Sequence, residues 1–364
     1  MSAAAELPVD IVVNNHNYGA YLEDAIESAR AQTHEKVEVI VVDDGSTDGS
    51  RALLARLGED VTVVLKENGG QASALNAGIE RCSGQIVMFL DADDVLRPEA
   101  AARVAAAFAG DDAVAKVQFR MDVIEADGRA TGAIKPAPHL PMPQGDRRRD
   151  ELAFPFDIAW MAMSGNAFRR TALERIMPIP ADEYPRSGAD WYLVHLTALL
   201  GTVVSLEEVS ASYRVHGANS YEPQAAELSV AHLRQAIERT APTSRALLRL
   251  AAELELPHPE RILSLADLAN RMASLRLEPG LHPLPDDRVS ALLADAVRAA
   301  HRRSNVSAPM KAMFVAWFAA MTVAPRPLAR WLAVLFLFPE RRTALNHVLR
   351  RLQRAGRGEA LAAA

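Results

Sequence analysis

Short apolar runs alternate with stretches of helical periodicity along residues 8–110. Strand-like runs rich in β-branched and aromatic residues occupy 9–13, 37–42, 61–65 and 86–90. Apolar residues recur every three or four positions in the segments between and after these runs, at 21–31, 50–57, 71–82 and 98–108. That spacing is the period of an amphipathic helix. Regular alternation of strand and helix predicts an α/β fold with a parallel, doubly wound sheet.

The pattern changes after residue 110. Segments 116–124 and 131–134 predict a hairpin that turns at 126–128. Residues 135–158 are rich in proline and charge and predict a long mobile loop, before further helix and strand at 164–173, 189–200 and 203–213. From about residue 225 the chain is rich in Ala and Leu and is predicted to be almost wholly helical, with breaks at Pro242, Pro257, Pro259, 279–285 and Pro309. We therefore expect an α/β domain over 1–224 and an all-α region over 225–364.

Two acidic clusters follow two of the strand-like runs directly. Asp43 and Asp44 come after 39–42, and Asp91, Asp93 and Asp94 come after 86–90. The carboxyl ends of parallel strands meet at one edge of a sheet, where ligands bind. Carboxylates gathered there repel unless a cation or hydrogen-bond donors offset them, and a divalent cation carrying a diphosphate fits that need. The alternative is that each cluster is a loop that caps a helix, because Asp and Ser favour such positions.

Composition narrows the class of protein. The chain has 364 residues, 49% of them hydrophobic and 24% charged, which is ordinary for a globular protein of two domains. Its one cysteine, Cys82, excludes an internal disulfide and fits a reducing compartment. The first residues lack a basic segment followed by an apolar core, so no signal peptide is expected and a cytoplasmic location is predicted.

Seven short motifs in a fixed order carry a resemblance to a known family. They lie at 12–18, 41–48, 68–70 with 76–78, 89–94, 164–170, 188–193 and 213–220. Together they resemble the inverting nucleotide-sugar glycosyltransferases of family 2. The resemblance implies the GT-A fold, a Rossmann-like mixed sheet flanked by helices, and it covers residues 8–220 only.

The resemblance implies a nucleotide site at the first acidic cluster. It places Asn14 and His16 around the base and ribose, although a polar loop after a strand would look the same. Asp44 would accept a hydrogen bond from the base, which suits a pyrimidine imide N–H because an ionised carboxylate only accepts. Asp43 would position the loop. The donor predicted in this way is a UDP-sugar.

The second cluster, Asp91-Ala92-Asp93, matches the DxD motif of the family. The resemblance implies that Asp93 binds Mg²⁺ or Mn²⁺ and that Asp91 contacts the ribose or a metal-bound water, while Asp94 is structural. Such ions are usually held by one or two carboxylates together with substrate phosphates and waters. His216 resembles a late histidine that approaches the metal or diphosphate in some relatives.

The resemblance also implies an acceptor side. Asp190 is the candidate general base, because an inverting transfer needs one carboxylate to take the proton of the acceptor hydroxyl. Many relatives carry Glu-Asp here, whereas this chain has Ala189 before Asp190, and the alternative role is that of a helix N-cap.

Further contacts are predicted around this side. Trp191 could bound the acceptor pocket or pack within its helix, and Gly165 and Asn166 are expected near the acceptor. Arg214 could pair with phosphate. Arginines 147–149 could do so from a closing loop, or they form a solvated charge run.

The last third of the chain is basic and apolar. Residues 225–364 carry 20 Lys and Arg against 12 Asp and Glu, whereas residues 1–224 carry 20 against 34. Segments 312–324 and 328–338 are apolar but too short to span a bilayer. They predict an interfacial helical hairpin that binds an anionic membrane surface through 309–357, at the inner face of the cell membrane. The alternative is a helical subdomain that packs on the catalytic domain or forms a dimer contact.

These observations predict a metal-dependent inverting glycosyltransferase. It would move a sugar from a nucleotide-diphosphate donor to an acceptor hydroxyl on a saccharide or lipid-linked saccharide, in the assembly of a surface polysaccharide or glycolipid. Two alternatives are a nucleotidyltransferase acting on sugar phosphates and a catalytically degenerate scaffold at the membrane. No phosphate-binding loop rich in Gly with Lys or Arg follows the first strand, which disfavours the nucleotidyltransferase, and the intact aspartates disfavour the scaffold.

Overall fold

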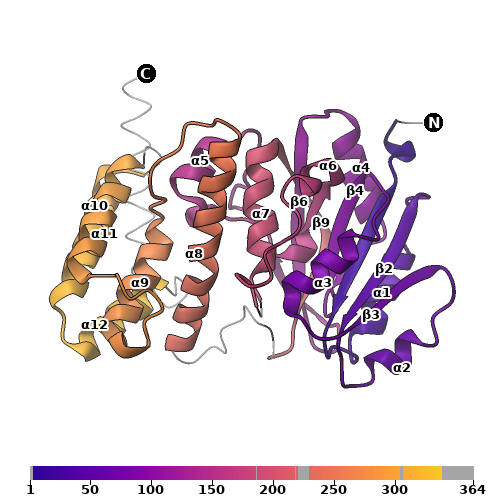
Figure 1. The fold of residues 1–364 in the computed structure, drawn as a ribbon, viewed down its shortest axis with the longest axis horizontal. Helices are drawn as coiled ribbons and strands as arrows, with labels where there is room; N and C mark the ends of the chain where they lie inside the picture. The colour runs from indigo at the N-terminus through magenta and orange to yellow at the C-terminus, as the bar shows by residue number, and fades with distance from the viewer. Residues whose placement is uncertain (1–2, 186, 218, 220–228, 304–305, 338–364) are drawn as a thin grey trace. The chain divides into compact units, whose positions relative to one another are not determined.

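The computed structural model describes residues 3–185, 187–217, 219, 229–303 and 306–337. They form two compact units, which Figure 1 shows in one colour scale from the N- to the C-terminus. The first unit draws on 1–151, 158–222 and 249–257, and the second on 152–157, 223–248 and 258–364. The single boundary predicted after residue 224 is simpler than this division, because helix α8 (Val230–Glu253) contributes to both units.

One mixed sheet of nine strands dominates the described part of the first unit. The strands are β1 (Val9–Asn15), β2 (Val37–Asp44), β3 (Val61–Lys66), β4 (Ile86–Asp91), β5 (Val95–Leu96), β6 (Val114–Glu125), β7 (Ala130–Lys135), β8 (Asn166–Arg169) and β9 (Thr202–Val215). Their order is β3-β2-β1-β4-β8-β6-β9-β5, with β7 paired to β6. The first four strands are parallel, β8 is antiparallel to both neighbours, and β6 runs parallel to β9. The predicted mixed sheet is therefore confirmed, as is the hairpin of β6 and β7.

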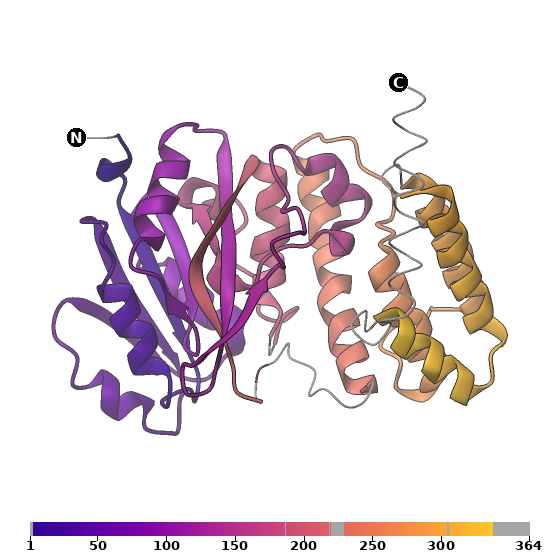
Figure 2. The ribbon, with the colours of Figure 1, turned by 180° about the vertical axis from the view of Figure 1, so that it is seen from behind.

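Helices cover both faces of this sheet, as the opposite views of Figures 1 and 2 show. They are α1 (Leu22–Arg30), α2 (Ser50–Leu54), α3 (Gly70–Ile79), α4 (Ala100–Ala109), α5 (Arg148–Ala153), α6 (Arg170–Glu174) and α7 (Ala189–Leu200). Short 3₁₀ turns occur at η1 (Ala3–Glu6), η2 (Pro155–Asp157) and η3 (Met163–Gly165). Helices α1 and α4 pack on one face and α3 and α7 on the other.

The central strands are buried on both faces, which explains their continuous apolar runs. In register, Val13 of β1 lies between Val41 of β2 and Leu90 of β4. On the α3 face, a Cβ added at Gly78 would lie 2.5 Å from the Val12 side chain, so the glycine lets α3 approach the sheet closely. The three strands consequently end side by side, with Asn14, Asp43 and Asp91 near their carboxyl ends.

Two sequence predictions are wrong. The predicted loop at 135–158 contains α5 and η2, and Glu151 of α5 is fully buried. The charged residues of this segment indicated a solvent-exposed loop, whereas the side chains of Glu151 and Leu152 are buried. Pro242 does not break the helical region but lies buried inside α8. A proline within a helix removes one backbone hydrogen bond.

The second unit is helical in its described residues. Besides part of α8 it contains α9 (Leu265–Leu277), η4 (Pro279–Leu281), α10 (Val289–Arg302), α11 (Ala308–Val323) and α12 (Arg326–Leu337). Helix α9 contacts α10, α11 and α12, and buried Leu268, Met272 and Phe318 form part of the shared core. Asp157 accepts hydrogen bonds from the backbone N–H groups of Leu265 and Ala266 at the start of α9. Among the described residues, no helix has both the length and the apolar character that crossing a bilayer requires.

Candidate active site

The loops after β1 and β2 are joined by a buried hydrogen-bond network. The Asn15 side-chain amide donates to Asp43 Oδ2 (2.9 Å) and to Ser46 Oγ (3.1 Å). Asp43 also accepts from the Ser46 backbone N–H (3.0 Å) and from Arg51 Nε (2.8 Å). Burial by itself raises the pKa of Asp43, but the donors Ser46, Arg51 and Asn15 outweigh it, and the pKa lies below its usual value. Asp43 thus anchors this loop as an ionised group, and its place in a nucleotide site stays a prediction.

Asp44 fixes a second loop. Its carboxylate accepts from the backbone N–H groups of Gly69 (2.9 Å) and Gly70 (2.8 Å) and pairs with Lys66 Nζ (2.5 Å). Gly70 has φ +79°, a conformation that favours glycine. These three donors hold the 66–70 segment against the end of β2. The predicted contact of Asp44 with the base stays a prediction.

His16 lies between these two loops. Its Nδ1 is 2.7 Å from the Asp44 carbonyl oxygen, and because a carbonyl only accepts, Nδ1 carries the proton. Its Nε2 lies 3.1 Å from the side-chain amides of both Asn17 and Asn68. His16 therefore connects the loops after β1 and β2 with residue 68. Its neighbour Asn14, on β1, lies in register with Asp91 and hydrogen-bonds the Asp91 side chain.

The acidic loop after β4 is crowded. Burial, then the charges of Asp93, Asp94 and Asp190, raise the pKa of Asp91 well above its usual value. Burial and the charge of Asp93 also raise the pKa of Asp94, to about 8, against hydrogen bonds from Arg214 and Ser164. Ser164 Oγ further accepts the Asp91 backbone N–H (3.0 Å). The loop thus gathers more carboxyl groups than its protein donors keep ionised.

Asp93 and His216 meet at this loop although they are 123 positions apart in the chain. His216 Nε2 lies 2.9 Å from Asp93 Oδ2, and the Asn219 side-chain amide lies 3.4 Å from the same oxygen. The His216 side chain is 3% exposed. The Tyr21 ring stacks on it at 4.8 Å, and the Tyr18 ring meets it edge-on at 5.5 Å. The structure thus brings together the two residues predicted to bind metal.

Arg214 has several protein partners. Its Nε donates to the Asp93 carbonyl (2.8 Å), Nη1 to the Ala126 carbonyl (3.0 Å), and Nη2 pairs with Asp24 (2.8 Å). Its backbone N–H donates to Asp94 Oδ1 (2.9 Å). The buried guanidinium therefore ties β9 to the acidic loop, to the β6–β7 turn and to α1. The contact with phosphate predicted for Arg214 stays a prediction. What the structure shows is that its guanidinium connects these three segments.

Asp190 lies in the first turn of α7. The helix begins at Ala189, and its N-cap residue is Gly188, whose φ is +98°. Asp190 is therefore not the N-cap, the alternative considered for it. The backbone N–H groups of Gly188 and Ala189 both donate to Gln71 Oε1 (2.9 and 3.1 Å), which fixes the start of α7 to α3. Asp190 is close enough for its charge to raise the pKa of Asp91, so the candidate base and the acidic loop share one region.

Other residues predicted to contact substrate have packing roles. A Cβ at Gly165 would lie 3.1 Å from both Met121 and Met161, so this glycine allows side chains to approach closely. The buried Asn166 amide donates to the carbonyls of Met161 (3.1 Å) and Ala162 (2.7 Å). Arginines 148 and 149 begin a helix rather than a closing loop. The acceptor contacts predicted for Gly165, Asn166 and the half-buried Trp191 stay predictions.

Comparison with known proteins identifies the family. The profile described as "Glycosyl transferase family 2" matches residues 10–177. An uncharacterized glycosyltransferase of Nostoc sp. is 35% identical over 224 residues, which cover 59% of this chain and 67% of that protein. The chain belongs to glycosyltransferase family 2.

Two further proteins are similar to this family 2 glycosyltransferase. The succinoglycan biosynthesis protein ExoO of Rhizobium meliloti is 32% identical over 216 residues, covering 57% of this chain and 60% of ExoO. Residues 1–349 of S. aureus TarS, solved with UDP-GlcNAc, match with a TM-score of 0.52 at 15% identity and 91% coverage of both chains. The TarS likeness shows the shared fold, which is GT-A.

The donor atoms of this glycosyltransferase fit a hard divalent cation. Among the described residues, no group of three or more His, Cys, Asp or Glu could hold a metal ion by itself. Asp93 and His216 instead offer one carboxylate and one imidazole beside further uncompensated carboxylates. A Mg²⁺ or Mn²⁺ ion bound there would take its remaining ligands from diphosphate and water.

The sequence assigned no role of their own to Tyr18, Tyr21 or Gln71, and it placed Ser164 only within a motif expected near the acceptor. Tyr18 and Tyr21 enclose His216, and Tyr18 lies so near Asp93 and Asp91 that burial and these charges raise its pKa to about 12. Tyr18 does stand within the first motif, and Ser164 opens the fifth. A tyrosine before a helix and a glutamine at a helix start carry no chemical signal of their own.

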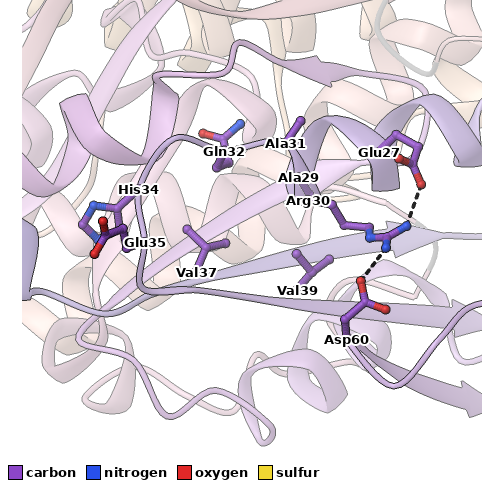
Figure 3. A pocket seen from close by; sticks show the side chains of 10 residues that line it. All are labelled: Glu27, Ala29, Arg30, Ala31, Gln32, His34, Glu35, Val37, Val39 and Asp60. Carbon is purple, nitrogen blue, oxygen red and sulfur yellow. Dashed lines mark hydrogen bonds and ion pairs between the residues drawn. The ribbon is translucent and has the colours of Figure 1, made fainter.

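A separate pocket lies at the other end of the strands. It has a volume of about 560 Å³ and is lined by the end of α1, the segment between α1 and β2, the start of β2 and Asp60 (Figure 3). Arg30 crosses it and pairs with Glu27 and Asp60. Val37 in its wall is the first residue of β2, whereas Asp43 and Asp44 are the last. The pocket is therefore not the candidate active site.

Replacing Arg214 by Lys tests whether the side-chain contacts of Arg214 stabilise the protein. Lys keeps the charge but cannot make the three side-chain contacts, so the free energy of unfolding should fall by about 2–4 kcal/mol in urea titrations. The matched change of the exposed Arg129 to Lys should leave it unaltered. Wild-type stability in the R214K variant would show that the contacts of Arg214 do not hold the site together.

Proposed function

We propose that this family 2 glycosyltransferase moves a sugar from a nucleoside-diphosphate donor to an acceptor hydroxyl, with inversion at the anomeric carbon and with a divalent cation. One observation carries the proposal: Asp93 and His216 lie 2.9 Å apart beside two further carboxylates, at the carboxyl end of β4. Such a site needs a cation and offers it few protein ligands, which leaves room for a diphosphate.

The donor is a UDP-sugar in this proposal. The loops anchored by Asp43 and Asp44 would receive the nucleoside, with Asn14 and His16 beside it. Asp44 would accept from the imide N–H of uracil through Oδ2, which already accepts from Gly70, because each carboxylate oxygen has two acceptor positions. TarS, which shares the fold, was solved with UDP-GlcNAc, although at 15% identity that likeness supports the fold alone.

Asp93 and His216 would hold the cation, and Asp91 would contact the ribose or a metal-bound water. When bound, Mg²⁺ or Mn²⁺ neutralises the charge that develops on the leaving diphosphate. Arg214 and Asn219 keep the Asp93 loop and His216 in place. Tyr18 and Tyr21 restrict the imidazole to one orientation.

Asp190 would act as the general base. It comes from a different element, α7, and lies in the region of the acidic loop. An inverting transfer needs a carboxylate on the side of the sugar opposite the leaving group, and Asp190 would serve there. Burial around Ala189 and the bonds to Gln71 keep the first turn of α7 in place without the Glu that many relatives carry before this Asp. Trp191, Gly165 and Asn166 would border the acceptor.

The acceptor is a saccharide or a lipid-linked saccharide in the assembly of a surface polysaccharide. ExoO, the relative named above, is a succinoglycan biosynthesis protein, which supports this class. Membership of family 2 argues against the nucleotidyltransferase alternative.

The second unit would hold the enzyme at an anionic membrane surface. The inner sides of α11 and α12 pack within the unit, where Trp317 Nε1 donates to the Leu332 carbonyl (2.9 Å). Their outer sides keep apolar residues exposed, with Val323 82% and Trp331 57% accessible. Residues 306–337 contain Lys311, Arg326 and Arg330 and neither Asp nor Glu. Apolar surface with only positive charge suits anionic lipid; positions 338–357 of the predicted segment lie outside the described residues.

Nucleotide binding tests the metal site. Thermal-shift measurements against UDP, GDP, dTDP and CMP should show stabilisation by UDP that depends on Mn²⁺. Asp93→Asn should weaken the Mn²⁺-dependent binding at least about tenfold, because a principal ligand is lost. Asp112→Asn, at an exposed position, is the control. A D93N variant that responds like the wild type would contradict the metal assignment.

Turnover tests the base. Asp190→Asn should lower the release of UDP from the donor about 10²- to 10⁴-fold, the usual contribution of a general base, while UDP affinity with Mn²⁺ is retained. Asp182→Asn, the same change at an exposed position before α7, should have no effect. Undiminished turnover in the D190N variant would exclude Asp190 as the base.

Liposome flotation tests the membrane surface. The full chain should float with vesicles that contain phosphatidylglycerol and not with pure phosphatidylcholine. Replacing both Leu328 and Trp331 by Ser should abolish flotation, whereas Leu281→Ser, at a comparably exposed position of the same unit, should not. Equal flotation of all three proteins would refute this role of α11 and α12.

A further inference from the structure

Four polar side chains from four separate segments meet in the interior beneath α7. They are Lys116 of β6, Glu151 of α5, Trp160 of the following segment and His195 of α7. Lys116 and Glu151 are both 0% exposed, and His195 is buried as well. None of the four belongs to the nucleotide or metal site described above.

Glu151 is the centre of this cluster. Its Oε1 lies 2.5 Å from His195 Nδ1, and its Oε2 accepts a hydrogen bond from Trp160 Nε1 at 3.1 Å. Both carboxylate oxygens are therefore engaged, each by a different segment. The cluster joins α7 to the chain around residue 160 through one side chain.

Lys116 adds a second connection between the same segments. Its Nζ donates to the Val194 carbonyl of α7 (3.1 Å) and lies 3.5 Å from the centre of the Trp160 ring. Burial lowers the pKa of the Lys116 ammonium well below its usual value, and the charge of Glu151 opposes that shift. Lys116 thus contacts the same two segments that Glu151 joins.

A buried network of this kind is costly, since each group loses water. When all members are paired, however, it fixes the relative positions of the elements that supply them, and removing one partner leaves others unpaired. Apolar residues of similar size would fill the same space without this cost. We therefore ask which elements the network holds in position.

Both segments that the network joins lead directly to the candidate active site. Helix α7 carries Asp190 and Trp191 in its first turn, and the Trp191 ring lies 5.4 Å from the His195 ring. The segment that begins at Trp160 runs into Ser164, whose Oγ accepts the Asp91 backbone N–H. A shift of either segment would change the distance between the proposed base and the acidic loop.

We propose that Glu151 is a positioning residue that fixes the first turns of α7 relative to the 160–164 segment, and so sets the acceptor side of the site. This inference rests on the proposed function, because Asp190 as the base and Trp191 at the acceptor are the groups whose placement Glu151 would determine. Glu151 itself touches neither substrate nor cation.

Glu151→Gln tests the proposal. Gln has the same shape but only one side-chain oxygen, so its NH₂ group must face either Trp160 Nε1–H or His195 Nδ1–H, and one hydrogen bond is lost. Hydrogen exchange at 158–163 and 189–195 should accelerate at least about tenfold, the loss expected for one buried hydrogen bond, while exchange in β1, β2 and β4 stays as in the wild type. Release of UDP from UDP-GlcNAc should fall by a similar factor, and affinity for UDP with Mn²⁺ should not change.

Two further variants keep the test decisive. Trp160→Phe removes only the Nε1–H donor and retains a ring beside Lys116, so it should show the same pattern as Glu151→Gln in milder form. It therefore tests the proposal even if the E151Q variant folds poorly. Asp295→Asn is the matched control, because Asp295 is a buried carboxylate of the second unit with two arginine partners. It should leave both segments and turnover unchanged.

Two results would overturn the proposal. One is unchanged exchange at both segments in the E151Q and W160F variants. The other is an equal loss of UDP affinity and turnover, which would indicate general damage. If the wild type neither binds UDP with Mn²⁺ nor releases it, the proposed function fails, whereas the exchange measurement still decides whether Glu151 positions the two segments.

Discussion

The loop after β4 places Asp91, Asp93 and Asp94 close together in a largely buried setting. Burial and mutual repulsion raise the pKa of Asp91 and Asp94, so the loop carries electrostatic repulsion that its neighbours must offset. The surrounding elements supply part of what is needed: Ser164 bonds the Asp91 backbone, Arg214 bonds Asp94 and the Asp93 carbonyl, and His216 bonds Asp93. A divalent cation would supply the further positive charge that these carboxyl groups need to be ionised together.

The topology of the sheet brings the partners of these aspartates to the acidic loop. The donors come from β9 and from the segment before β8, far along the chain; β8 joins the sheet beside β4, and β9 joins it two strands further out, beyond β6. Short β5 pairs with β9 directly after the acidic loop, which holds the loop against the segment that carries Arg214 and His216. The long excursion between 96 and 202 therefore returns to the place where β4 ends. The excursion also supplies α7, so the proposed base approaches the same loop from another side.

The sequence allowed the strands, the helices up to residue 110 and the site of the acidic loops to be predicted, because buried parallel strands read as continuous apolar runs. It also allowed Asp93 and His216 to be paired through family resemblance. It did not reveal α5, since a run of arginines and aspartates looks solvated even when Glu151 turns inward. Nor did it reveal the partners of Arg214 or the rings that enclose His216. These depend on contacts between segments far apart in the chain, which no local pattern encodes.

A crystal of the protein grown with UDP and Mn²⁺ tests the central claim most directly. Anomalous scattering at the manganese edge locates the ion without assumptions about its ligands. The account predicts one strong peak, at a position where the ion would contact Asp93, His216 and the diphosphate of UDP, with the uracil beside Asp44. A manganese peak elsewhere, or UDP bound in these loops without the ion, would contradict it.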